Sequence, residues 1–430
     1  AERFAEGVPG TGVLSATVPG LLRGLGDLHE RFGSRDLASL MRPAIQLAEV
    51  GFAVHRQLAL NTAERASLLA KDPGASALFL PGGRPLAEGD RLVQASLAGV
   101  LRRVAERGVT PFYSGELAER IAAASAKLGG LIAAEDLARH ESLWQAPIAA
   151  PFYGHEVVTM PPNSFGATLL FQLLELEAGG IDAADPRSVD FIRKGYAARR
   201  SAYRAAARLI ADPSRGEAPL RERLAAAIAG RGQAALPEGA EPAESRDRCT
   251  TCAVAVDREG MAVSLIESIS APYGAGVVLE DTGILLNNRM AGFDKDPASP
   301  NGVAPGKRPA NTLAPCLVMK DGRLAMSLGT PGTVGQTCTL AQFLARVLAC
   351  GEDAAEAVAA PRWSIDFKGK LVIEEGMDEA LRRAVLDAEA EAKTMRDGWI
   401  SFGSIKAALA AKGGWRGIAD RRRAAAALSY

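Results

Sequence analysis

The first half of the chain carries apolar residues at spacings of three and four, the period of an amphipathic helix. Pro43, near the start of the first such segment, and Gly51, just after it, occupy the positions these residues favour at helix ends. Around Tyr153-Gly154 the pattern instead predicts a short hairpin over 149–160. The expected helices cover residues 37–50, 92–106, 115–128 and 189–210.

The pattern changes to short β-rich runs after residue 248. Asp321-Gly322 between two such runs is a strong signal for a tight hairpin. Helical periodicity returns near the C-terminal end. Helices, then hairpins, then helices predict an α+β fold in which helices flank central antiparallel sheets. The expected strands are 251–256, 261–269, 316–320 and 323–328, and the later helices are 336–348 and 379–392.

Two segments lack any periodic pattern. Residues 232–248 are polar and rich in Pro and Gly, so a flexible linker is expected there. Residues 421–427, three arginines followed by four alanines, are expected to form a solvated tail.

Composition narrows the range of partners. Lys and Arg together number 50, as do Asp and Glu, so no net charge favours nucleic acid or an anionic membrane. No apolar run reaches the roughly 18 residues that a membrane span needs. Neither nucleic acid nor a membrane is therefore expected as a partner. A periplasmic and a cytoplasmic location both stay open.

The five cysteines are odd in number and scattered, which argues against a disulfide framework. Cys249 and Cys252 form one Cys-x-x-Cys pair, but no second pair or matching histidines accompany it. Neither a metal nor an organic cofactor is expected.

The junction at Thr250 offers a nucleophile. A threonine hydroxyl needs a base, supplied by a histidine or by the residue's own α-amino group. All four histidines precede the linker, and none lies in the strand-rich half. Cleavage after Cys249 would free an amine with a pKa of about 7.7–8.0, suited to general-base catalysis at neutral pH.

Several motifs in order resemble the γ-glutamyltranspeptidase family of N-terminal-nucleophile hydrolases. Those of the small subunit are 250–257, 282–288 and 305–309, and those of the large subunit are 17–21, 42–48 and 160–162. The resemblance implies a four-layer αββα sandwich and self-cleavage before Thr250. Residues 1–249 would be a large-subunit-like region, N-terminally truncated relative to the family and ending in the linker, and 250–430 a small-subunit-like region. Together they would form one composite domain. The product would be a heterodimer of the chain's own fragments, with further oligomerisation left open.

The family's roles carry over to named positions. Thr250 matches the nucleophile, and Ser268 matches a hydroxyl that contacts the nucleophile's amine. Gly332-Thr333 stand where backbone N–H groups form the oxyanion hole. Alternatives stay open, since the serines could line a solvated face and the other positions could serve only turns. Cys249 could also be the terminal nucleophile. The expected substrate-binding residues are Ser270, Asn311 and Thr312.

The resemblance implies a small-molecule amide as the partner, and the expected reaction is amide hydrolysis or acyl transfer on γ-glutamyl, glutathione-like or related amides. Gly292 stands where the family has an acid for the substrate's amino group, and the family's Arg segment has no counterpart before Ala1. Gly335-Gln336 resembles the hydrolase branches, which include acylases and an oxamate amidohydrolase. Hydrolysis of a different amide and an unprocessed, non-catalytic chain are the alternatives.

Overall fold

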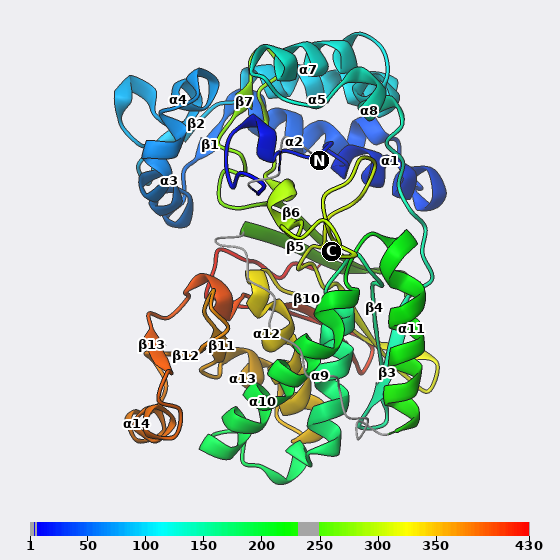
Figure 1. The fold of residues 1–430 in the computed structure, drawn as a ribbon, viewed down its shortest axis with the longest axis vertical. Coiled ribbons are helices and arrows are strands. Elements are labelled where there is room, and N and C mark those ends of the chain that lie inside the picture. Colours follow the sequence, from blue (N-terminus) through cyan, green and yellow to red (C-terminus); the bar gives the residue numbers. More distant parts are fainter. Residues whose placement is uncertain (1–3, 5–6, 231–248, 430) are drawn as a thin grey trace. The chain divides into compact units, whose positions relative to one another are not determined.

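The computed structural model describes residue 4, residues 7–230 and residues 249–429, and its path is drawn in Figure 1. The chain forms two compact units. Unit 1 is built from the described parts of residues 1–5, 145–268 and 292–430, and unit 2 from those of 6–144 and 269–291. Each of the two expected fragments therefore contributes to both units. The linker expected at 232–248 lies outside the described residues.

A six-stranded antiparallel sheet forms the centre of unit 1, in the order β15-β14-β10-β9-β4-β3. The pairing of β4 with β9, in which Val157 lies opposite Val318, joins strands from either side of the Cys249–Thr250 bond. The strands are β3 (Ile148–Phe152), β4 (His155–Thr159), β9 (Cys316–Lys320), β10 (Arg323–Gly329), β14 (Lys406–Ala411) and β15 (Gly414–Ala419).

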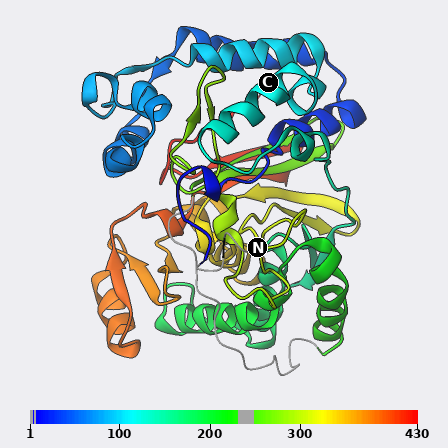
Figure 2. The same cartoon turned by 45° about the horizontal axis from the view of Figure 1, so that its top comes forward.

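Helices cover one face of this sheet, and Figures 1 and 2 both show α9 and α10 on the same side of it. Helix α9 is apolar nearly all round and packs between the sheet and its neighbouring helices, as expected of a central helix. Phe171, Val318 and Leu340 belong to the core formed there. The helices are α9 (Gly166–Ala178), α10 (Val189–Ala206), α11 (Pro213–Ala229) and α12 (Gln336–Leu344).

A second, two-stranded sheet of β5 (Cys249–Val256) and β6 (Ala262–Ser270) packs against this sheet. Strand β5 contacts β10 and β14. Gly329 makes the close approach possible, because a Cβ at that position would lie 2.7 Å from Ile266 Cδ1 and 3.6 Å from Cys252 Cβ. Unit 1 thus has layers of helices, a large sheet and a small sheet.

The rest of unit 1 is a smaller α/β layer. Its strands β11 and β12 pair antiparallel, and β12 and β13 pair parallel. The elements are β11 (Trp363–Ile365), β12 (Leu371–Glu374), β13 (Lys393–Met395), α13 (Ala354–Ala359) and α14 (Glu379–Ala388).

Unit 2 is mainly helical, and two asparagines tie its two chain segments together. Asn287 exchanges hydrogen bonds with the Thr17 backbone, and Asn288 Nδ2 donates to the Gly10 carbonyl. The elements are α1 (Leu21–Phe32), α2 (Leu37–Val50), β1 (Phe52–Ala53), α3 (Arg56–Leu69), α4 (Pro73–Phe79), β2 (Arg91–Leu92), α5 (Ala95–Arg107), α6 (Thr110–Tyr113), α7 (Glu116–Lys127), α8 (Ala134–Ala138), β7 (Val278–Leu279) and β8 (Ile284–Leu285).

The predicted α+β class, with helices flanking antiparallel sheets, is confirmed. Several helix boundaries differ from expectation. Helix α5 begins at Ala95 rather than 92 because Arg91–Leu92 pairs with β1. Helix α10 ends at Ala206 rather than 210, α12 at Leu344 rather than 348, and α14 at Ala388 rather than 392. The solvated tail predicted at 421–427 is wrong at Arg422, whose guanidinium pairs with the buried Glu374 and Asp420. Within the described ranges, no helix has the length and apolar character to span a bilayer.

Candidate functional site

Thr250 lies at the start of β5 on its inner face. Exposure alternates along the strand, with Thr250 and Cys252 buried and Thr251 and Ala253 exposed, as the two-residue period of a strand requires. Since Cys252 faces Gly329 on the six-stranded sheet, Thr250 faces that sheet too. Thr250 is only 6% exposed, and its Oγ1 has no hydrogen-bond partner within the described part of the chain.

The β5–β6 hairpin brings Ser268 to the same face. The Asp257 N–H donates to the Met261 carbonyl at 3.0 Å, and an unbroken antiparallel register from that bond predicts Ser268 opposite Thr250. Ser264 Oγ donates to the Leu328 carbonyl at 2.8 Å, so the even-numbered side chains of β6 also point at the large sheet. This register places the two hydroxyl-bearing side chains on the same face of the small sheet, and a contact of Ser268 with the Thr250 amine stays a prediction.

Ser270, the last residue of β6, belongs to unit 2. It is buried and has a φ of +79°, so it does not lie on a solvated face. Asn288 fixes the chain on both sides of Ser270. Its side-chain Oδ1 accepts from the Ala271 N–H at 2.9 Å, and its backbone N–H donates to the Ile269 carbonyl at 3.1 Å. Its role in substrate binding stays a prediction.

The turn after β10 presents two backbone donors. Gly332 has φ +145° and Thr333 has φ +56°, and both are buried. In the described part of the chain neither N–H finds an acceptor, while the Gly332 carbonyl accepts from the Gly335 N–H at 2.8 Å. A β-branched residue at positive φ is strained, and such strain persists where surrounding structure holds it, often at functional sites. Two adjacent free N–H groups can stabilise an oxyanion.

The segment 400–404 supports this turn. Thr330 Oγ1 accepts from the Ser404 N–H at 2.9 Å, and Thr333 Oγ1 lies 3.4 Å from Ser401 Oγ. Gly335 is required here, since a Cβ would overlap the Ser401 carbonyl oxygen. The conformation of the turn therefore depends on a segment about 70 residues further along the chain.

A buried ion-pair network holds that segment in turn. Arg362 donates to the Phe402 carbonyl at 2.8 Å and pairs with Asp420 at 2.6 Å. Burial lowers the pKa of Arg362 to about 10. Burial would raise the pKa of Asp420, but the charges of Arg362 and Arg422 outweigh it and hold that pKa below its ordinary value. Sequence reasoning missed these supports because their partners are distant in the chain.

Asn311 and Thr312 differ in their surroundings. The Asn311 N–H donates to the Asn163 carbonyl at 2.9 Å, and its Oδ1 accepts from the Leu313 N–H at 3.1 Å, as in a turn. Thr312 is buried, and its Oγ1 has no partner among the described residues. The hydroxyl of Thr312 is thus the more available of the two for a ligand.

Gly292 has no room for a side chain. A Cβ there would lie 2.5 Å from the Ala310 carbonyl oxygen. Asn301 fixes this approach, because its Nδ2 donates to the Gly292 carbonyl at 2.8 Å and its Oδ1 accepts from the Ala310 N–H at 2.9 Å. The nearby Asp294 carboxylate accepts from the Ser299 hydroxyl. An acid at position 292 would require the backbone to move.

Gln336 is a further polar residue that the sequence motifs did not assign a role. It begins α12 directly after the turn and is fully buried, and neither Nε2 nor Oε1 has a partner in the described ranges. An unpaired buried amide costs free energy, so it marks a place where a ligand can bind. Its burial was not visible in the sequence.

The structure offers little support for a cysteine nucleophile or a metal site near Thr250. Burial raises the pKa of the Cys252 thiol, which disfavours the reactive thiolate. The side chain of Cys249 lies outside what the structure describes. In the described ranges, no three His, Cys, Asp or Glu side chains gather in a way that could hold a metal ion.

Comparison with known proteins gives consistent matches. The family model described as gamma-glutamyltranspeptidase matches residues 1–430. The acylase ACY 1 proenzyme of Pseudomonas sp. (strain SE83) is 34% identical over 87% of this chain and 68% of the relative. The glutathione hydrolase proenzyme of Escherichia coli (strain K12) is 31% identical over 92% and 72%. The crystal structure of cephalosporin acylase from Bacillus halodurans matches with a TM-score of 0.86 and 27% identity over 96% and 78%.

Proposed function

The chain is an enzyme of the γ-glutamyltranspeptidase family, and from this premise we propose that it hydrolyses an amide with Thr250 as nucleophile after cleaving itself. The observation that carries the proposal is the Thr250 hydroxyl. It is buried, has no partner among the described residues, and faces the large sheet from the start of a strand. A buried hydroxyl without a hydrogen-bond partner lowers the folding stability. A catalytic role would explain why the chain keeps one here.

Processing begins with attack of Thr250 Oγ1 on the Cys249 carbonyl carbon. The Cys249–Thr250 C–N bond breaks as the acyl group moves to oxygen, which leaves an ester and a free Thr250 amine. Water then hydrolyses the ester, giving a carboxylate on Cys249 and restoring the hydroxyl. The enzyme's base is thereby made from its own backbone.

In turnover the Thr250 amine accepts the hydroxyl proton as Oγ1 attacks the substrate carbonyl. The N–H groups of Gly332 and Thr333 donate to the oxyanion. The amine returns the proton to the leaving nitrogen, and water hydrolyses the acyl ester. Ser268, opposite Thr250 in the predicted register, holds the amine in place.

The two fragments are proposed to stay together as a heterodimer. The pairing of β4 with β9 crosses from one fragment to the other within one sheet. Backbone hydrogen bonds in a buried sheet do not separate without unfolding. Both proenzyme relatives carry names that imply processing.

The substrate proposed here is an amide whose acyl group has a carboxylate but no α-ammonium. Gly292 supplies no carboxylate to pair with an ammonium group, and its contact with Ala310 leaves no space for an acidic side chain at this position. The buried Thr312 hydroxyl, which has no partner among the described residues, can donate to the carboxylate. The similarity to an acylase supports an acyl group other than γ-glutamyl. A γ-glutamyl substrate is the second candidate, supported by the similarity to a glutathione hydrolase.

A matched pair of substrates separates the candidates. Glutaryl-p-nitroanilide and γ-glutamyl-p-nitroanilide differ only in the α-ammonium group. We expect kcat/KM to be about tenfold or more in favour of the glutaryl compound, since an unpaired ammonium must be desolvated at no gain. A preference for the γ-glutamyl compound would assign the chain to the second candidate.

A further inference from the structure

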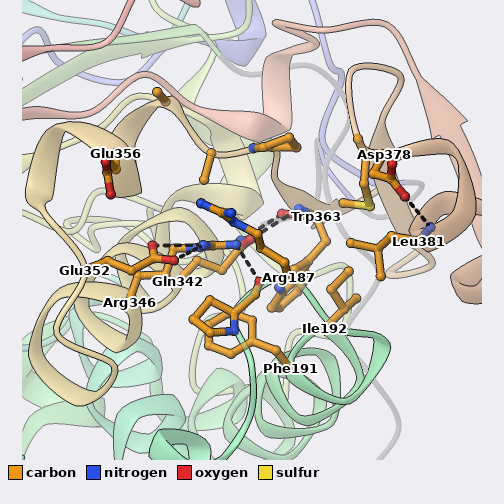
Figure 3. Close-up of a pocket in the computed structure, with 15 residues that line it drawn as sticks. Arg187, Phe191, Ile192, Gln342, Arg346, Glu352, Glu356, Trp363, Asp378 and Leu381 are labelled. Atoms are coloured by element: carbon orange, nitrogen blue, oxygen red, sulfur yellow. Dashed lines mark hydrogen bonds and ion pairs between the residues drawn. The ribbon is translucent and has the colours of Figure 1, made fainter.

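We propose that unit 1 contains a second ligand site, which binds a short zwitterionic peptide with an apolar side chain. The site is a pocket of about 610 Å³ among α10, α12, α13, β11 and the start of α14 (Figure 3). This volume lies within the range of roughly 300–1,000 Å³ typical of small-molecule sites. The lining includes none of the residues assigned to the amide-cleaving machinery, so the proposal goes beyond the proposed function.

The pocket has an apolar floor. Phe191 and Ile192 come from α10, Trp363 from β11 and Met377 from the turn before α14. All four are buried in the core between these elements. An apolar side chain entering the pocket would lose water-exposed surface at about 25 cal/mol per Å².

Two polar residues of the pocket are already fully engaged. Arg346 donates to both carboxylate oxygens of Glu352, at 3.0 and 2.9 Å, and to the Pro186 carbonyl at 2.7 Å. Gln342 Nε2 donates to the backbone carbonyl of Trp363 at 2.8 Å, and Gln342 Oε1 accepts from the backbone N–H of Trp363 at 3.2 Å. These groups make a rigid wall rather than ligand contacts.

Two opposite charges on the pocket's lining are left unengaged. Within the described part of the chain, the Arg187 guanidinium and the Glu356 carboxylate form no hydrogen bond or ion pair, with each other or with other residues. Both are exposed, and Figure 3 draws no dashed contact to either group. Of the other two acids on the lining, Glu352 pairs with Arg346 and Asp378 is the N-cap of α14.

This arrangement is complementary to a peptide with free ends. A carboxylate fits the fork of the Arg187 guanidinium, an ammonium fits Glu356, and an apolar side chain fits the floor. A single ion would leave one of the two charges unused, and a neutral apolar ligand would leave both. The volume of the pocket, about 610 Å³, favours a peptide over a free amino acid.

Calorimetric titration of the whole protein with Phe-Gly tests the proposal. Wild type should bind, and Arg187→Gln and Glu356→Gln should each weaken binding about tenfold, the loss of one charged hydrogen bond. Phe-Gly amide lacks the carboxylate, so Arg187→Gln should not change its affinity. N-acetyl-Phe-Gly lacks the ammonium, so Glu356→Gln should not change its affinity. The control Arg139→Gln removes an exposed arginine of unit 2 and should change nothing.

Both substitutions replace exposed side chains, so folding is expected to persist and is checked by circular dichroism. Absence of binding at millimolar Phe-Gly, or equal affinities for wild type and both variants, would overturn the proposal. The proposal would also be overturned if a variant lost the same affinity for the capped peptide as for uncapped Phe-Gly. None of these results depends on Thr250, so failure here and failure of the proposed function are distinguishable.

Discussion

Thr250 and Thr251 are adjacent, alike in chemistry and opposite in orientation, which makes them a matched pair. We expect Thr250→Ala to stay uncleaved and to lose at least about a thousandfold in kcat/KM, because nucleophile and base disappear together. Thr251→Ala, which changes an exposed residue, should be cleaved and active. Electrophoresis under denaturing conditions and amide hydrolysis assays measure both. Cleavage and normal turnover in Thr250→Ala would refute the assignment.

Gln336 offers a second test at the level of one side chain. Replacing the unpaired buried amide with the similar volume of Met should raise stability by about 1–3 kcal/mol. The same change should raise KM if the amide binds substrate. Thermal unfolding and steady-state kinetics report the two effects separately. A variant that is more stable and kinetically unchanged would show that Gln336 has no part in binding.

At the scale of elements, the turn after β10 depends on Gly335. A Gly335→Ala change pushes a methyl into the Ser401 carbonyl, and we expect a loss of more than about 2 kcal/mol in unfolding free energy and of most activity. Gly99→Ala is the control, because it lies within α5 with open space around it. That change should stabilise by about 0.5–1 kcal/mol. Urea unfolding measures both, and equal effects would contradict the packing described.

The Arg362–Asp420 pair supports the segment against which the turn rests. Breaking it with Asp420→Asn should cost about 3–5 kcal/mol, since a buried guanidinium loses its counter-charge. The pKa of Asp420 in the folded protein lies below its ordinary value of 3.8. The Asp420 charge therefore stabilises the fold fully above pH 3.8, and this stabilisation is lost as the pH falls through the lower, folded-state pKa.

Unfolding free energies at pH 7 and pH 3 measure this dependence. The difference between wild type and Asp420→Asn should be large at pH 7 and smaller at pH 3. A difference that does not change with pH would show that the Asp420 charge contributes nothing.

The sequence predicted the elements that local pattern determines. Helix α2 and strand β9 have the expected bounds, and the hairpin at Asp321-Gly322 is present, because periodicity and turn chemistry act over a few residues. The site was predictable only in part. The sequence predicted Thr250 at the junction before a strand. The burial of Thr250, the ion-pair network beneath the turn and the burial of Gln336 arise from contacts between distant segments.

At the scale of the whole molecule, the Cys249–Thr250 bond divides a chain whose large sheet draws strands from both sides. We expect the fragments 1–249 and 250–430 to co-elute in gel filtration under native conditions and to separate in denaturant. Their association should not weaken on dilution to nanomolar concentration, since the β4–β9 pairing is part of the core. Separation of native fragments would contradict this account.

The identity of the first residue of the smaller fragment tests the central claim most directly. N-terminal sequencing and intact mass of purified, active protein should show a fragment that begins at Thr250 with a free amine. An intact Cys249–Thr250 bond in active protein, or a fragment that begins at Cys249 or elsewhere, would contradict the claim that Thr250 supplies both nucleophile and base.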